Sequence, residues 1–431
     1  MEAKHFCGLD FGTSNSTVAV PRGEEVELVA LEGDARTLPS SIFFDFSDGR
    51  PIFGRAAIKA YVDGAEGRLM RSLKSVLGSA LMDETTRIKT RTYTFKDIIG
   101  LIVGRLKAAA DAALDADVSQ VVLGRPVHFV DDNPAADGRA QNALEEIARA
   151  CGFREIAFQY EPIAAALAYE QTVREEQYAL IADIGGGTSD FSVVRVSPQG
   201  RYKPDRAADI LANKGVHIGG TDIDRLFSLK TVMPYLGLGG EMRLPFSDKA
   251  ILVPNGFFVD LATWHRINLL YTPKVSRDIE EVRRYALSPG KIARLADIVE
   301  ARRGHSIALS VEAAKIGLSD APTAAIDLSE VERGFVVAAE PKTLNEAIAD
   351  QLGSLTRTLG DTLAASGLAG GRIDAVFLTG GSTAIPAVRA AVTGATPKAK
   401  IIEGDMFGAV GLGLGLDARR KFGSDALRRS A

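Results

Sequence analysis

Two glycine-rich turns, each between two apolar segments, constrain the fold of this chain of 431 residues more than any other feature. The first turn is Asp10-Phe-Gly-Thr-Ser-Asn15, and the second is Asp183-Ile-Gly-Gly-Gly-Thr-Ser-Asp190. Each follows one strand pattern and leads into another, which predicts two β-hairpins. Because the turns share their order of residue types and occur near the starts of the two halves, they form an internal pseudo-repeat. The repeat predicts two related lobes that each present one turn to a shared cleft.

Helical and strand patterns alternate between these turns. Residues 97–116 carry apolar side chains at the spacing of an amphipathic helix, and residues 121–126 form a short apolar strand. Helical patterns follow at residues 138–151, and at residues 163–169 after Pro162. This alternation predicts an α/β architecture.

Two regions have weaker patterns. Residues 237–304 contain clusters of proline, glycine and charged residues, and we interpret them as an elaboration of the second lobe. The end of the chain, residues 417–431, is charged and rich in small residues, which predicts a last helical turn and a frayed tail.

The composition argues against two kinds of partner. The chain has 51 Lys and Arg against 55 Asp and Glu, so its net charge of -4 gives no basic excess for nucleic-acid binding. The best membrane candidate, residues 406–416, is much shorter than the roughly 20 apolar residues that span a bilayer. Cys7 and Cys151 lie far apart and fit small core residues in a reducing compartment. Since the N-terminus has no secretory signal pattern, we expect a cytoplasmic protein.

The two repeated turns have the chemistry of an anion site that includes a cation. Gly12 lets the backbone approach a ligand closely, and Thr13 and Ser14 add hydroxyl donors. Three consecutive glycines in the second turn, each costing roughly 0.5–1 kcal/mol relative to alanine, are easier to explain if the backbone wraps an anion. The flanking aspartates would repel phosphate unless a cation lay between them, and Mg²⁺ fits that need.

A third segment, residues 375–387, combines a buried strand, Gly380-Gly381 and a helix that Pro386 opens. The N-terminus of a helix after a strand can bind an anion or a nucleotide, although a plain strand–helix turn explains the same residues equally well. No Walker A sequence and no His-Glu-x-x-His sequence occur, and the five histidines show no metal-ligand spacing.

In this order, the three turns resemble the two phosphate loops and the adenosine loop of the actin, sugar-kinase and heat-shock ATPase superfamily. Further segments are similar to those of DnaK-type chaperones, the seventy-kilodalton heat-shock proteins. They are residues 72–78 (Ser-Leu-Lys-Ser-Val-Leu-Gly, similar to the helix that carries the catalytic lysine), 160–169 (Tyr-Glu-Pro-Ile-Ala-Ala-Ala-Leu-Ala-Tyr), 219–224 (Gly-Gly-Thr-Asp-Ile-Asp), 311–319 (Val-Glu-Ala-Ala-Lys-Ile-Gly-Leu-Ser) and 405–411. The resemblance extends from residue 8 to about residue 416, and the start of the chain looks most like the YegD-type homologues.

The resemblance implies an actin-like ATPase fold in which each lobe contains a five-stranded mixed sheet with helices around a central nucleotide cleft. It also implies a division of the chain. Lobe I would be residues 1–172, with a core of 1–38 and 106–172 and an inserted subdomain of 39–105. Lobe II would be residues 173–420, with a core of 173–216 and 347–420 and an inserted subdomain of 217–346, followed by a tail of 421–431.

Roles at the site are implied in the same way. Asp10 and Asp183 would hold the Mg²⁺ shell, with support from Asp190, and Asp183 would also act in catalysis. Lys74 would neutralise charge on the transferred phosphoryl group, while Glu161 and Thr188 would place the attacking water. The residues that would bind ATP or ADP are Gly12, Thr13, Ser14, Asn15, Gly185, Gly186, Gly187, Gly219, Gly220, Glu312, Lys315, Ile316, Ser319, Gly380, Gly381, Ser382, Ala384 and Asp405.

The chain departs from the family pattern at two points. Ile316 and Ala384 stand where typical members have arginines that sandwich the adenine, and such a stack contributes about 1–3 kcal/mol. We therefore expect ATP to bind more weakly than in typical members. After residue 420 no apolar linker and no β-rich peptide-binding domain follow, so we do not expect the usual DnaK cycle from this chain alone.

The resulting hypothesis is an ATP-binding chaperone-like protein of the stress-response type. Slow Mg²⁺-dependent hydrolysis would open and close the lobes, and the output would pass to a client or co-chaperone protein. A nucleotide-dependent binding module without hydrolysis is the alternative from another class. A sugar kinase and a filament-forming actin homologue remain further alternatives, although no segment indicates the catalytic base of a sugar kinase.

Overall fold

The computed structural model of the chain describes most of its residues. They are residues 5–130, 133–203, 205–243, 249–368, 370–402 and 408–423. Asp405, which the resemblance assigned to the nucleotide site, and residues 424–431 of the predicted tail lie outside the described residues.

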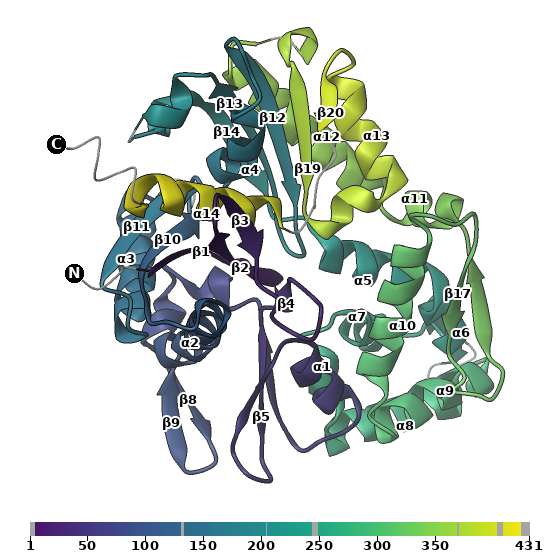
Figure 1. Cartoon of the computed structure of the whole chain (residues 1–431). Helices are drawn as coiled ribbons and strands as arrows, with labels where there is room; N and C mark the ends of the chain where they lie inside the picture. The colour runs from purple at the N-terminus through teal and green to yellow at the C-terminus, as the bar shows by residue number, and fades with distance from the viewer. Residues whose placement is uncertain are drawn as a thin grey trace.

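Two hairpins of matching register organise the molecule (Figure 1). Their strands are β1 (His5–Phe11) with β2 (Asn15–Arg22), and β12 (Gln177–Ile184) with β13 (Ser189–Val196). Next to the turn, Phe11 pairs with Ser16 in the first hairpin and Ile184 pairs with Ser189 in the second. Both predicted hairpins are confirmed, and each turn joins its strands in the equivalent way.

Each hairpin is extended into a mixed sheet. The order is β11-β10-β1-β2-β3 in lobe I, with the short β4 paired to β2, and β14-β13-β12-β19-β20 in lobe II. The added strands are β3 (Glu25–Leu28), β4 (Leu38–Pro39), β10 (Val118–Arg125), β11 (Glu155–Tyr160), β14 (Ile210–Val216), β19 (Ala375–Thr379) and β20 (Lys400–Ile402). Strand β10 lies parallel to β1, as β19 does to β12. The predicted α/β fold with a five-stranded mixed sheet in each lobe is confirmed.

Helices cover these sheets and separate them. The helices of the sheet regions are α2 (Phe95–Leu114), α3 (Pro134–Ala150), α4 (Glu161–Glu170), α12 (Ala349–Ala365), α13 (Pro386–Ala395) and α14 (Ala409–Phe422). Helix α2 begins with a capping box, because Thr94 and Asp97 each accept a hydrogen bond from the other's backbone N–H. Helices α4 and α14 pack against each other between the two sheets (Figure 1).

Helix α14 makes direct backbone contact with its neighbours. A Cβ atom at Gly413 would lie 1.8 Å from the carbonyl oxygen of Ala164 on α4. A Cβ atom at Gly8 of β1 would lie 2.1 Å from the backbone nitrogen of Gly415. Glycine is required at these positions because any side chain would push the helix away from the sheet and from α4.

The inserted part of lobe I is built from small antiparallel sheets. It contains β5 (Ser41–Asp45), β6 (Pro51–Phe53), α1 (Gly54–Val62), β7 (Gly67–Arg71), the 3₁₀ turns η1 (Leu73–Val76) and η2 (Ala80–Asp83), β8 (Thr85–Ile88) and β9 (Arg91–Thr94). The segment at residues 72–78, which the resemblance likened to a helix, is a single 3₁₀ turn. Ser72 before it has a left-handed φ of 58°, and Leu77 after it has a non-helical ψ of 131°, so the helical turn is bounded on both sides.

The inserted part of lobe II is mainly helical. It contains α5 (Gly220–Thr231), α6 (Met233–Leu236), β15 (Glu241–Arg243), β16 (Ala250–Leu252), α7 (Gly256–Ala262), η5 (Ile267–Leu270), α8 (Pro273–Tyr285), α9 (Pro289–Glu300), α10 (Gly304–Gly317), β17 (Ala324–Asp327), β18 (Val336–Ala339) and α11 (Pro341–Ala347). Residues 237–304, interpreted above as a weakly patterned elaboration of the second lobe, contain the helices α7, α8 and α9. Helix α8 buries only Ile279 and Val282, so its apolar pattern was too sparse to recognise.

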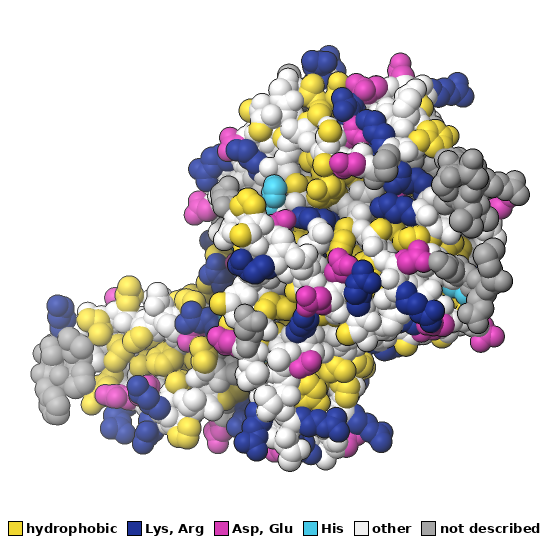
Figure 2. Space-filling view, turned by 90° about the vertical axis from the view of Figure 1, so that its left-hand side faces the viewer, with side chains coloured by type: hydrophobic (Ala, Val, Ile, Leu, Met, Phe, Trp, Pro, Cys, Tyr) yellow, Lys and Arg dark blue, Asp and Glu magenta, His cyan; other side chains and the backbone are white. Residues whose placement is uncertain are grey.

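Two large apolar clusters stabilise the lobes separately. One joins the lobe II sheet to its helical insertion, and the other joins the lobe I sheet to α2, α3 and the small β-sheets. On the face shown in Figure 2, basic and acidic side chains are interspersed. Among the described residues, no helix combines the length and apolar character needed to cross a membrane. The domain boundaries given above stay predictions.

Candidate functional site

The two repeated turns meet across the boundary between the lobes. A Cβ atom at Gly186 would lie 2.2 Å from Ser14 Oγ, so the second turn touches the first only because it has no side chain there. Ser40 braces the first turn from below: its N–H donates to the carbonyl of Ser14 at 2.8 Å, and its hydroxyl donates to the carbonyl of Gly12 at 2.6 Å. The sequence did not indicate Ser40, which lies outside every motif.

Lys74 and Glu161 form a buried ion pair beside these turns. Lys74 Nζ lies 2.5 Å from Glu161 Oε1, and the two side chains are only 10% and 15% exposed. Glu161 is the first residue of α4, where the helix dipole favours a carboxylate, and Pro162 follows at the second position. The structure thus brings together two predicted catalytic residues that are 87 positions apart.

Two buried carboxylates lie close to this pair. Burial and the charge of Glu161 raise the pKa of Asp10 to about 7, although Lys74 lowers it. Burial and Glu161 also raise the pKa of Asp183 to about 6. For Lys74, burial acts to lower the pKa, but Glu161, Asp10 and Asp183 outweigh it and raise the pKa above its usual value. The single ammonium group of Lys74 therefore lies near three carboxyl groups.

The excess of carboxyl groups over basic groups is suited to binding a divalent cation. Asp10 Oδ1 is buried and has no hydrogen-bond partner among the described residues. Within the same residues, no three or more His, Cys, Asp or Glu side chains are grouped as metal ligands. A cation held by Asp10 and Asp183 would therefore keep several water or phosphate ligands, which is the habit of Mg²⁺ rather than of zinc.

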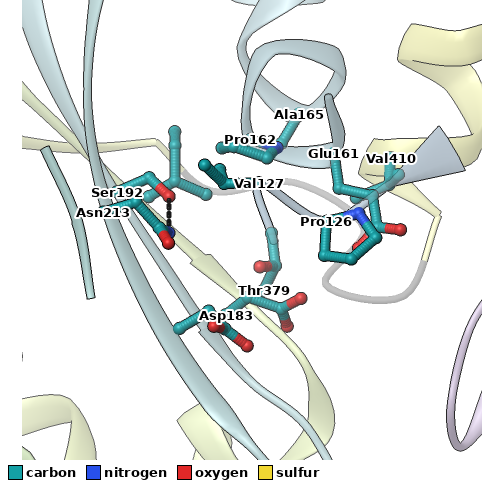
Figure 3. A pocket seen from close by; sticks show the side chains of 12 residues that line it. Pro126, Val127, Glu161, Pro162, Ala165, Asp183, Ser192, Asn213, Thr379 and Val410 are labelled. Atoms are coloured by element: carbon teal, nitrogen blue, oxygen red, sulfur yellow. Dashed lines mark hydrogen bonds between the residues drawn. The ribbon is translucent and has the colours of Figure 1, made fainter. Parts of the chain in front are cut away.

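A small cavity of about 30 Å³ adjoins the carboxylates (Figure 3). Glu161, Asp183 and Thr379 line one part of it, and Asp190 lines it as well. Its volume suits about one water molecule. The cavity therefore offers space for a water beside Glu161, which is where the predicted nucleophile would be needed.

The opposite side of the cavity is closed by two polar residues that the sequence reading did not single out. Asn213 Nδ2 donates to Ser192 Oγ at 2.8 Å, from neighbouring strands β14 and β13 (Figure 3). No motif contains either residue, because only the pairing of the two strands brings them to the cavity.

Two segments that are distant in the chain contact the second turn. The N–H of Gly220 donates to the carbonyl of Gly185 at 2.9 Å, and Ser382 Oγ donates to the same carbonyl at 3.2 Å. A Cβ atom at Gly219 would lie 2.4 Å from the backbone of Gly186 and Gly187. The predicted phosphate and adenosine loops are thus neighbours in space.

The predicted turn residues that remain have mainly backbone roles. The N–H of Gly185 donates to the carbonyl of Thr188 at 2.9 Å, which closes the second turn, while Asn15 pairs with Pro39 of β4. Gly380 has a left-handed φ of 80°, and a Cβ atom there would lie 2.8 Å from Asp183 Oδ1. A side chain at position 380 would therefore disturb the carboxylate.

Helix α10 supplies the residues predicted to bind the nucleoside. Lys315 is 7% exposed and forms an ion pair of 2.7 Å with Asp224 of α5. Burial raises the pKa of Asp224 to about 6, although Lys315 lowers it. Ile316 is 59% exposed, whereas Ala384 in η7 (Gly381–Ala384) is half-buried. Asp224 ends a segment that the resemblance quoted, but its pairing with Lys315 was not foreseen.

Arg71 and Trp264 also lie at this side of the cleft and were not predicted. Together with Asp224, Glu312 and neighbours they line a second cavity of about 40 Å³. Arg71 directly precedes the segment 72–78. This position next to a recognised segment was the only sequence feature that could have indicated its place at the cleft.

A comparison with protein families identifies one family that this chain matches. The family model described as Hsp70 protein matches residues 6–231, which is more than half of the chain. The matched part contains both repeated turns, Lys74, Glu161 and α5.

Proposed function

Since this chain belongs to the Hsp70 family, an ATP-binding chaperone-like group, we propose that it binds Mg·ATP between its lobes and hydrolyses it slowly. The observation that carries the proposal is the buried Lys74–Glu161 ion pair beside Asp10 and Asp183, directly under two facing glycine turns. Phosphoryl transfer depends mainly on positioning and on compensation of charge, and this arrangement supplies both.

Each residue then has a separate task. The backbone of the two turns would donate N–H groups to the phosphate oxygens, and Lys74 would compensate the charge that develops on the transferred group. Glu161 would orient a water in the adjoining cavity toward the phosphorus atom. Asp10 and Asp183 would hold Mg²⁺, which when bound supplies positive charge between the phosphate oxygens.

Closure of the lobes around the nucleotide would be the output of the reaction. The lobes meet through Ser14 and Gly186, so a ligand between the turns contacts both at once. We propose that a client or co-chaperone protein reads this state, and that the chain is a cytoplasmic homologue of the YegD type.

A single-turnover assay with radiolabelled ATP tests the function. We expect phosphate release that requires Mg²⁺ and that no added sugar accelerates. Tight nucleotide binding without any turnover would favour the binding module instead. Transfer of the label to a hexose would overturn the proposal in favour of a sugar kinase.

A further inference from the structure

Arg71 connects the two sides of the cleft. It is the last residue of β7 in lobe I, yet its guanidinium carbon lies 4.6 Å from the ring centroid of Trp264. Trp264 belongs to lobe II, in the turn between α7 and η5. The flat guanidinium group suits an aromatic face, and the contact is stronger where water is excluded.

Trp264 is itself held firmly in place. Its ring centroid lies 4.7 Å from that of His305, and its carbonyl oxygen lies 3.1 Å from His305 Nε2. On the other side of His305, the ring of Tyr61 from lobe I lies at 4.8 Å. The Trp264–His305 pair of lobe II therefore packs between Arg71 and Tyr61 of lobe I. Arg71 thus contacts an aromatic side chain that its own neighbours hold in place.

Carboxylates of lobe II add an electrostatic attraction. Burial lowers the pKa of Arg71, while the charges of Glu312 and Asp224 act to raise it. An arginine stays protonated under such conditions, so the guanidinium group remains a cation facing two acids. Glu312 lies on α10, and Asp224 pairs with Lys315 of the same helix, so Arg71 faces the region predicted to bind the nucleoside.

The connection from Arg71 to Lys74 is short and stiff. Ser72 has a left-handed backbone, and its carbonyl oxygen accepts hydrogen bonds from the N–H and the hydroxyl of Ser75, at 3.2 and 2.7 Å. Leu73 between them is buried in the core of lobe I. A movement of Arg71 away from lobe II would therefore be passed along the chain to Lys74.

We propose that Arg71 is a positioning residue, which holds the Lys74 turn in its productive place when lobe II docks against it. Closure of the lobes at the nucleoside side of the cleft thereby fixes the position of the Lys74–Glu161 ion pair at the phosphate side. This inference rests on the proposed ATPase function and adds a coupling between the two halves of the site.

The test compares Arg71→Met and Arg71→Lys with a control on the same strand, Arg68→Met. Arg68 is exposed and hydrogen-bonds to Thr86 Oγ1 of its own lobe, so its loss should be neutral. For Arg71→Met we expect the single-turnover rate with Mg·ATP to fall about tenfold or more, while the Kd measured by calorimetry changes less than threefold. Arg71→Lys should recover part of the rate, because it keeps the charge but not the flat stack.

Trp264→Ala tests the same contact from the side of lobe II. It should slow turnover in the same way, and the double variant Arg71→Met, Trp264→Ala should be no slower than the worse single variant. An unchanged rate in Arg71→Met, or a loss confined to nucleotide affinity or to thermal stability, overturns the inference. A wild-type protein without ATPase activity would instead refute the proposed function, so the two failures are distinguishable.

Discussion

At the scale of single residues, the main feature of the site is an excess of acidic over basic side chains. Lys74 is the neighbour of Asp10, Glu161 and Asp183, and all four groups are buried or nearly so. A site of this kind is costly for the empty protein and favourable for a cationic ligand. The chemistry we assign to the site follows from this balance.

Lys74→Ala and Glu161→Ala should each reduce the ATP hydrolysis rate by about 10²–10³-fold, because in the proposed function both side chains act on the transition state. Nucleotide affinity should change much less, since in the proposed function the backbone of the glycine turns would still bind the phosphates. Single-turnover rates and calorimetry check the two quantities separately. Turnover like that of the wild type in both variants would remove these residues from the mechanism.

The affinity for Mg·ADP should depend on pH. The folded protein raises the pKa of Asp10 to about 7 and that of Asp183 to about 6, so at lower pH protons compete with the cation. Affinity should therefore rise between about pH 5.5 and 7.5 and then level off, with protons released on binding near pH 6.5. Calorimetry in buffers of different ionisation enthalpy measures this release.

The same shifts affect stability in the opposite direction. A carboxyl group with a raised pKa in the folded state binds more protons when folded than when unfolded. The free energy of unfolding without ligand should thus fall as the pH rises from about 4 to about 7. A ligand-free protein that gains stability across this window would contradict the assignment.

At the scale of elements, the packing of α14 depends on glycine. Gly413 lies against the backbone of α4, and Gly8 of β1 lies against the backbone of Gly415, so the helix joins the two lobes at backbone distance. From the sequence, this segment was notable only for its resemblance to the family at residues 405–411 and for a short apolar stretch at residues 406–416. Its role became apparent from the neighbours that these glycines touch.

Gly413→Ala should destabilise the protein by about 1–3 kcal/mol, because the new methyl group would overlap the carbonyl of Ala164. The control is Gly360→Ala in α12, where no atom lies within 4 Å of the added Cβ. That variant should be stabilised by roughly 0.5–1 kcal/mol, since alanine favours a helix. Chemical denaturation measures both, and equal effects would show that α14 does not need its glycine.

At the scale of the whole molecule, the lobes contact each other around the cleft at two levels. The glycine turns meet at the depth of the cleft, and the inserted parts meet at its rim. Tyr61 donates a hydrogen bond of 2.9 Å to Asn268 Oδ1 and places its ring against His305. We expect a nucleotide that enters or leaves between the lobes to require separation of the contacts at the rim.

Tyr61→Ala should therefore accelerate the dissociation of ADP several-fold, as followed by stopped-flow with a fluorescent ADP analogue. Tyr235→Ala is a suitable control, because Tyr235 packs on Phe335 within lobe II and is 44% exposed. A dissociation rate unchanged by Tyr61→Ala would mean that the rim contacts do not limit release.

Local features of the sequence determined both hairpins, the α/β architecture and the family. Each glycine turn and each strand pattern is a property of a few consecutive residues, so it could be read without knowledge of contacts. Helix α8, within residues 237–304, buries few apolar residues, so its sequence pattern is weak, and the fold class did not depend on it.

Only the tertiary structure decided the energetics of the site. Lys74 and Glu161 are separated by 87 positions, and the raised pKa values of Asp10 and Asp183 arise from burial between elements that are distant in the chain. The contact of Arg71 with Trp264 likewise exists because two inserted parts meet. Burial and charge depend on distance in space, which no short stretch of sequence contains.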